Sequence, residues 1–316
     1  MTTSGSFNFT LTRNEIITQA LRDLGVLADG EDATADQITD GNIRLNMMVK
    51  AWRSKGISLP LYQELVVFLE DSEDSYLIGA TGDKATTLND YVKTELSAAA
   101  SSGASTLTVD SITGISSGDV IGVVLDSDTI HWTTVNGAPS GSTITLTAVT
   151  TGDAAIDNHV YTYTSIAQRP LTVKGARVKV NDGNETPVRV ITRQEYFSYV
   201  NKTATGTVTA VYYDPQIDNG VLYTYPCSNT VNDVVLLTVQ RQVADFDGTN
   251  DNSDFPVEWL EPLVKNLAKR MLTKYGVDTA TAEQVRIDAK ESLEDAEDFD
   301  QEGSFSFAPA SEGYED

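Results

Sequence analysis

The order of segment types constrains this chain more than any single motif. Helical periodicity is confined to the two ends, at about residues 12–56 and 256–298, and the region between them has the pattern of short strands. An amphipathic helix cannot bury its apolar face alone, so the terminal helices are expected to pack together. This order predicts an α+β fold: a helical base built from N- and C-terminal helices, with an antiparallel β region and an inserted small β-sandwich or barrel.

Helix boundary signals support the assignment of both ends. Thr12 and Glu15 have the spacing of a capping box, and apolar residues then recur at helical spacing as far as Gly25. Similar patterns predict a second helix that starts after Thr34 and ends at Gly56, and a third that starts near Pro256 and ends at Gly276. A fourth helix is expected from about Thr279 to Asp298, with its cap formed by Thr281 and Gln284.

Composition separates the central region into two parts. Residues 94–168 contain no Lys or Arg and are rich in Ser, Thr, Gly, Ala and Val, with strand-like runs between Gly and Asn turns. Strand patterns at 62–69 and 169–245 flank this block, and a short helix is expected at 193–200. We therefore expect residues 1–75 and 166–300 to form a core, 91–165 an inserted β domain, and 301–316 a flexible acidic C-terminal tail.

The charge balance excludes a surface that coats DNA. The chain has 22 Lys and Arg against 46 Asp and Glu, a formal net charge of -24, and 13 of the acidic residues lie in 278–316. Sequence-independent phosphate binding needs the opposite sign. No apolar run approaches the roughly 18–20 residues that span a bilayer, and the N-terminus lacks a signal peptide pattern. We expect a protein made in the cytoplasm that makes no contact with a membrane.

The two histidines give little sign of a metal site. His131 and His159 both lie in the inserted block, where Asp126, Asp128 or Asp157 would be the nearest additional ligands. Their spacing matches no helical or knuckle pattern. Two ordinary sheet histidines are the favoured interpretation.

Other candidates for chemistry also have simpler explanations. Five carboxylates that suggest glycoside cleavage are better explained as a charged turn after a strand, and the segment 245–254 resembles a calcium loop only in composition. The single cysteine, Cys227, is expected to be a small buried residue. A string of tyrosines has the character of a base-stacking surface, but no basic residues interleave it, so sheet packing or an interface is preferred. The carboxylates are Glu64, Glu70, Asp71, Glu73 and Asp74, and the tyrosines are Tyr212, Tyr213, Tyr223 and Tyr225. We expect no catalytic residue, cofactor or metal, and no enzyme activity.

Several segments in order resemble one protein family. They are TRNEIITQALRDLGV, MMVKAWRSKGISLPLY, RPLTVKGARV, ITRQEYFSYVNKTATGTVTAVYYDP, GVLYTYPC and DFPVEWLEPLVKNLAKRMLTKYG. Together they are similar to the head-to-tail adaptor proteins of short-tailed bacteriophages over about residues 11–75 and 166–298. The block from 91 to 165 is extra to the minimal adaptor.

The resemblance implies a structural virion protein of the tail or neck, assembled in the host cytoplasm. Such adaptors form rings of twelve copies below the portal protein, continue the DNA channel without specific DNA binding, help to retain packaged DNA, and dock nozzle and fibre or spike proteins. Phe299, Phe305 and Phe307 are candidate anchors for the portal protein. The alternative is a receptor- or glycan-binding tail module that uses the Thr/Ser-rich inserted block. A cell-wall hydrolase is a remote third hypothesis, since no residue set here supports that activity.

Overall fold

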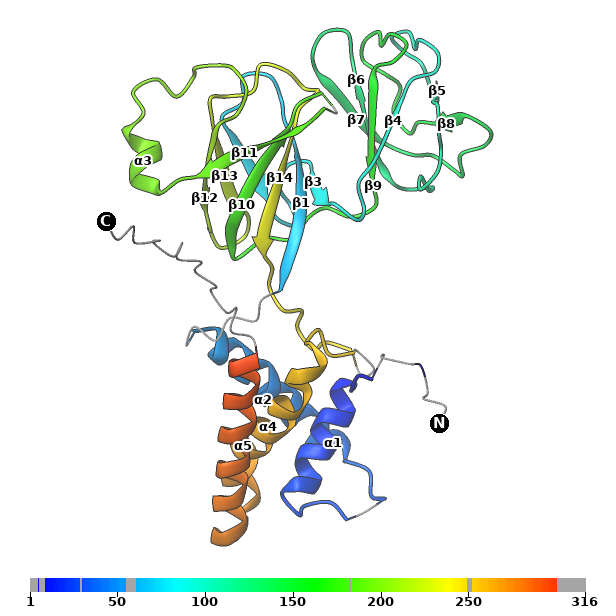
Figure 1. Cartoon of the computed structure of the whole chain (residues 1–316). Helices are drawn as coiled ribbons and strands as arrows, with labels where there is room; N and C mark the ends of the chain where they lie inside the picture. The colour runs from blue at the N-terminus through cyan, green and yellow to red at the C-terminus, as the bar shows by residue number, and fades with distance from the viewer. Residues whose placement is uncertain are drawn as a thin grey trace, which may run out of the picture. The chain divides into compact units, whose positions relative to one another are not determined.

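The computed structural model describes residues 5, 9–28, 30–54, 61–181, 183–248 and 252–299, apart from the side chains at 53, 54 and 299. The chain divides into two compact units. A helical unit combines residues 1–60 with 243–316, and a β unit holds residues 61–242 (Figure 1). Each apolar cluster among the described residues is made within one unit.

The helical unit is built from both ends of the chain. Its elements are α1 (Arg13–Asp23), α2 (Ala35–Ser54), the 3-10 turn η1 (Val257–Trp259), α4 (Leu260–Tyr275) and α5 (Thr279–Phe299). Helix α4 contacts each of the other three α-helices, which lie beside it (Figure 1). The rings of Trp52 and Trp259 meet edge to face, with centroids 5.9 Å apart, in the centre of a shared core. Neither end of the chain buries this core alone.

Local capping fixes where these helices begin and end. The capping box of Thr12 and Glu15 is present at α1, and Gly276 ends α4 with a left-handed φ of 60°. The predicted cap of the last helix is wrong, because Asp278 accepts hydrogen bonds from the backbone N–H groups of Ala280 and Thr281. Thr281 therefore lies inside α5. The predicted end of the second helix at residue 56 lies outside the described residues.

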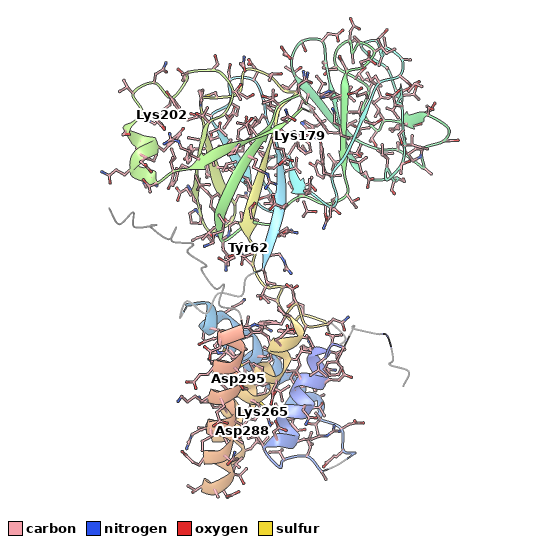
Figure 2. The ribbon with its side chains drawn as sticks, in the orientation of Figure 1. Tyr62, Lys179, Lys202, Lys265, Asp288 and Asp295 are labelled. Atoms are coloured by element: carbon pink, nitrogen blue, oxygen red, sulfur yellow. The ribbon has the colours of Figure 1, made fainter. Side chains whose placement is uncertain are left out.

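Buried polar contacts connect α5 to the rest of the helical unit. The amide of Asn266, which is buried in α4, donates to the carbonyl oxygen of Ala289 at 2.8 Å. The ammonium of Lys265 lies 3.0 Å from Asp23 of α1 and 3.8 Å from Asp288 of α5 (Figure 2). These contacts set how α1, α4 and α5 align.

The β unit is dominated by one large sheet. Its eight strands have the order β2-β13-β12-β11-β10-β14-β1-β3, and all pairs are antiparallel except β11 with β12. Apolar residues from most of these strands form a core on one face of the sheet. The strands are β1 (Tyr62–Phe68), β2 (Ser75–Ile78), β3 (Ala85–Thr87), β10 (Thr172–Lys179), β11 (Glu185–Val190), β12 (Ala210–Asp214), β13 (Gly220–Tyr225) and β14 (Val234–Gln240).

Two smaller sheets lie between β3 and β10 in the sequence. A four-stranded sheet has the order β4-β9-β6-β7, and β5 pairs with β8. They enclose an apolar cluster of their own. The strands are β4 (Val92–Glu95), β5 (Thr106–Thr108), β6 (Val120–Val124), β7 (Ile130–Thr134), β8 (Thr143–Thr145) and β9 (His159–Tyr163).

Aromatic residues join this block to the large sheet. Phe68 of β1 packs against four rings of the block, and the closest is Trp132, with centroids 5.0 Å apart. The other three rings belong to Tyr91, Tyr161 and Tyr163. The aromatic residues of the inserted block are thus used in packing.

The fold class predicted from the sequence is wrong. The chain is β-rich: helices account for 27% of the described residues, and the largest element is a nearly closed, barrel-like sheet of eight strands. The helices are not a base to which a minor β region is added. The error has a physical cause, since caps and helical stripes are strong local signals, whereas each short strand gives a weak one. The parallel pairing of β11 with β12 also departs from the antiparallel region that was predicted.

No helix in the described part of the chain has both the length and the apolar character needed to cross a bilayer. This finding refers only to the residues that the structure describes.

Candidate ligand-binding surface

A short helix covers one face of β12 and β13. Helix α3 (Arg193–Ser198) begins at a capping box, in which the Thr192 hydroxyl accepts from the N–H of Glu195 at 3.3 Å and the Glu195 carboxylate accepts from the N–H of Thr192 at 2.7 Å. Figure 1 shows α3 beside these strands. The helix and the strands contribute six aromatic side chains, which we call the aromatic surface: Tyr196, Phe197, Tyr199, Tyr212, Tyr223 and Tyr225.

Strand alternation decides which tyrosines belong to this surface. Tyr212 lies opposite Tyr223 in the antiparallel pair and packs with α3. Tyr213, the next residue, points to the opposite face, where its hydroxyl donates to the carbonyl oxygen of Pro170 at 2.8 Å within the core of the sheet. The predicted tyrosine string is therefore divided between two faces. Tyr213 contributes to packing, as the sequence suggested for the whole string.

The rings of the aromatic surface are stacked closely. Tyr212 and Tyr223 are nearly parallel, inclined by 8° with centroids 5.7 Å apart. Tyr199 and Tyr225 are closer, at 3.9 Å and 10°. Phe197 is the most exposed of the six, with 49% of its surface accessible. The cluster thus has a packed interior and an open rim.

Positive side chains surround this rim. The Arg193 guanidinium lies 5.0 Å from the centroid of the Phe197 ring, and the Lys202 ammonium lies 5.5 Å from the same centroid. Arg189 donates to the Tyr199 hydroxyl at 3.4 Å. Figure 2 labels Lys202 near α3. No basic residue interleaves the tyrosines in the sequence from 212 to 225, but three basic residues contact the other rings of the aromatic surface, Tyr196, Phe197 and Tyr199.

The nearby carboxylates already have partners. Asp214 accepts hydrogen bonds from Arg193 and Gln216, each at 3.3 Å. Glu195 is held by the capping box, and the hydrogen bonds from Thr192 lower its pKa. The charged groups in contact with the exposed ring of Phe197 are Arg193 and Lys202.

A buried hydroxyl lies under the rim. Tyr196 is almost fully buried, and among the described residues its hydroxyl has no hydrogen-bond partner. Burial raises the pKa of Tyr196 to about 12, so the phenol stays neutral at physiological pH. A buried polar atom without a partner is uncommon in proteins and costs free energy.

The two histidines do not form a metal site. His131 is on β7 and His159 on β9, and β6 lies between those strands. His131 contacts the Thr151 hydroxyl at 3.3 Å, whereas His159 contacts the Tyr161 hydroxyl at 3.1 Å. Within the described ranges no group of three His, Cys, Asp or Glu residues is placed to hold a metal ion.

The carboxylates near β1 have structural partners. Glu64 forms an ion pair with Arg177 at 2.9 Å and accepts from the Thr238 hydroxyl at 2.6 Å. Asp71 accepts from the Ser72 hydroxyl in the turn after β1. In that turn, burial and then the charges of Asp74, Glu70 and Asp83 raise the pKa of Glu73.

The remaining sequence candidates are placed as follows. In the segment 245–254, of which 249–251 lie outside the described residues, Asp245 pairs with Lys50 at 3.1 Å. Cys227 is buried, which raises the pKa of its thiol, and its Sγ donates to the carbonyl oxygen of Lys202 at 3.2 Å. The side chains of the proposed portal anchors Phe299, Phe305 and Phe307 all lie outside the described residues.

Sequence reasoning missed the residues that complete the aromatic surface. Arg193, Phe197 and Lys202 were placed only in or near a short helix, without a function. The available signal was the aromatic spacing of EYFSY between two basic residues. This spacing indicated an amphipathic helical turn, but it did not indicate which strands the turn packs against.

No protein-family model and no curated protein matches the chain. Among solved structures, the chain is similar to the Gp54 tailspike of Acinetobacter baumannii bacteriophage AP22, in complex with A. baumannii capsular saccharide, with 15% identity and a TM-score of 0.22. The match covers 25% of this chain and spans only 15% of the tailspike.

Proposed function

We propose that this chain is a non-enzymatic component of a bacteriophage tail whose β unit binds a glycan receptor on the bacterial surface. The observation that carries the proposal is the aromatic surface, where two cations lie close to the ring of a half-exposed Phe197. Sugar rings present C–H faces that pack on aromatic rings, and their polar substituents accept hydrogen bonds from charged donors. The assignment to a bacteriophage rests on the sequence resemblance.

The aromatic surface is a better candidate for glycan binding than the inserted block. In that block, Trp132, Tyr161 and Tyr163 pack against Phe68 of the large sheet. Its remaining surface is rich in Ser and Thr and carries few charges. The aromatic surface combines an exposed ring with positioned donors, which is the usual composition of a saccharide-binding site.

The partners of Glu64 and Asp214 support binding without catalysis. Hydrolysis of a glycosidic bond needs two carboxyl groups that face a common substrate. Glu64 is engaged by Arg177 and Thr238, and Asp214 by Arg193 and Gln216. These acids act in the structure as acceptors for neighbouring side chains.

A glycan array tests the proposal directly. The full chain is expected to bind a defined subset of bacterial saccharides, and Phe197→Ala is expected to lose that binding. Val149→Ala is a matched control, since its side chain has the same 49% exposure but lies in the inserted block. Equal binding by Phe197→Ala and the unchanged chain would contradict the assignment of the site.

A head-to-tail adaptor is the second candidate. The helical unit favours it, because Ile43 and Met47 of α2 leave apolar surface exposed in a shallow depression beside Arg44 and Arg270. A structural connector uses such surface to contact neighbouring proteins. Electron microscopy of the chain mixed with portal protein is expected to show rings under this hypothesis. Removal of residues 300–316, which contain two of the proposed anchors, should then weaken attachment without loss of fold.

A further inference from the structure

We infer that the aromatic surface selects a saccharide that carries carboxylate groups, such as a uronic acid. The inference rests on the proposed function and specifies the class of glycan. It follows from the two cations in contact with the exposed ring of Phe197. Guanidinium and ammonium groups only donate hydrogen bonds and are best matched by an anionic acceptor.

The cations at this surface are held in position. Lys202 donates to the carbonyl oxygen of Tyr199 at 3.1 Å, and its own carbonyl accepts from the thiol of Cys227. Arg193 is held by Asp214 and by its contact with the Phe197 ring. Side chains fixed before binding lose less conformational entropy when a ligand arrives.

The carboxylates near the rim are held by neighbouring groups. Asp214 and Glu195 each accept two hydrogen bonds at one of their two carboxylate oxygens. The charged groups in contact with the Phe197 ring are the two cations. A carboxylate on the ligand meets Arg193 and Lys202, while the sugar ring packs against Phe197.

The net charge favours a sparsely charged glycan over nucleic acid. A chain of -24 repels a strand that has one phosphate on each nucleotide. A polysaccharide with isolated carboxylates experiences less repulsion, and at physiological salt the field of distant acids is screened beyond about 8 Å. The nearby cations then determine the local attraction.

Calorimetric titration of the full chain separates the possibilities. The three probes are an acidic hexasaccharide in which glucuronate alternates with N-acetylglucosamine, the neutral maltohexaose and a single-stranded DNA oligonucleotide. We expect the acidic hexasaccharide to bind most tightly. Arg193→Gln combined with Lys202→Gln should weaken that binding roughly tenfold or more. Lys269→Gln, an exposed lysine of α4, is the control and should leave it unchanged.

Each other outcome has a defined meaning. If maltohexaose binds as tightly as the acidic hexasaccharide and the double variant binds normally, the selection of acidic sugars is wrong while the proposed function stands. If DNA binds best, the surface has a different class of ligand and both are wrong. If neither saccharide binds and the array is also negative, the proposed function fails and the inference fails with it. Thermal unfolding of each variant verifies that it is folded.

Discussion

The rings of Tyr199 and Tyr225 stack with centroids 3.9 Å apart and planes inclined by 10°. Tyr199 immediately follows α3, whereas Tyr225 is the last residue of β13. The stacked pair therefore joins the segment that carries the cations to strand β13 of the large sheet. A helix of only six residues has little stability of its own, so this contact helps to hold it on the sheet.

The stacked pair is expected to be energetically coupled. Tyr199→Ala and Tyr225→Ala should each destabilise the β unit, and a double-mutant cycle should give a coupling of about 0.5–1.5 kcal/mol. Chemical unfolding of the four proteins measures it. Strictly additive losses would show that the rings touch without stabilising one another.

The helical unit should depend on a core shared between the two chain ends. Leu267 of α4 is fully buried in that core, so Leu267→Ala should cost about 2–5 kcal/mol of unfolding free energy. Lys269→Ala, two residues further and exposed, should change it by less than about 0.5 kcal/mol. Urea unfolding followed by tryptophan fluorescence reports on this unit when Trp132, the tryptophan of the β unit, is replaced by Phe in every variant. Comparable effects of the two changes would argue against the shared core.

Asp233 should make the β unit less stable as pH rises. The residue is 2% exposed, and burial raises its pKa despite the hydrogen bond from the Asn181 N–H. Because the folded-state pKa is raised, this group favours folding below its ordinary pKa of 3.8, and that contribution is lost as pH rises through the folded-state pKa. Asp233→Asn keeps the acceptor and should be more stable than the unchanged chain at pH 7.

The difference between Asp233→Asn and the unchanged chain should disappear below pH 3.8, where the carboxyl group is protonated in both states. Asp218→Asn, at an exposed position in the turn between β12 and β13, is the control. Thermal unfolding across the pH range provides the test. A stability difference between Asp233→Asn and the unchanged chain that does not vary with pH would rule out ionisation of Asp233 as its cause.

Glu64 should matter for stability but not for turnover. Its pair with Arg177 is about one-third exposed, so Glu64→Gln should cost less than about 1 kcal/mol. The purified chain is expected to leave cell-wall substrate intact in a zymogram, both with and without this change. A cleared zone that Glu64→Gln abolishes would instead identify a hydrolase.

Sequence reasoning succeeded where the interaction was local. The box of Thr12 and Glu15 spans four residues and could be identified directly, and the strand pattern from Tyr62 predicted β1. It failed at α5, because Asp278 and Thr281 are both good caps and the preference for Thr281 with Gln284 was not decisive. The choice between Asp278 and Thr281 as the cap of α5 depends on the position at which the chain leaves α4.

The candidate site needed information that is not local. Phe197 meets the tyrosines of β12 and β13 because β11 and β12 pair in parallel, which sends the intervening segment across the sheet. Nothing in the spacing of the residues indicates that pairing. The fold class was predicted wrongly for a similar reason. The capping signals of the helices are strong and local, whereas the many strands that make the chain β-rich each give only a weak signal.

Hydrogen–deuterium exchange of the full chain with a saccharide that it binds on the array tests the central claim most directly. The account predicts that binding slows exchange in residues 191–202 and in β12 and β13. Protection confined to residues 91–165, or to the helical unit, would contradict it.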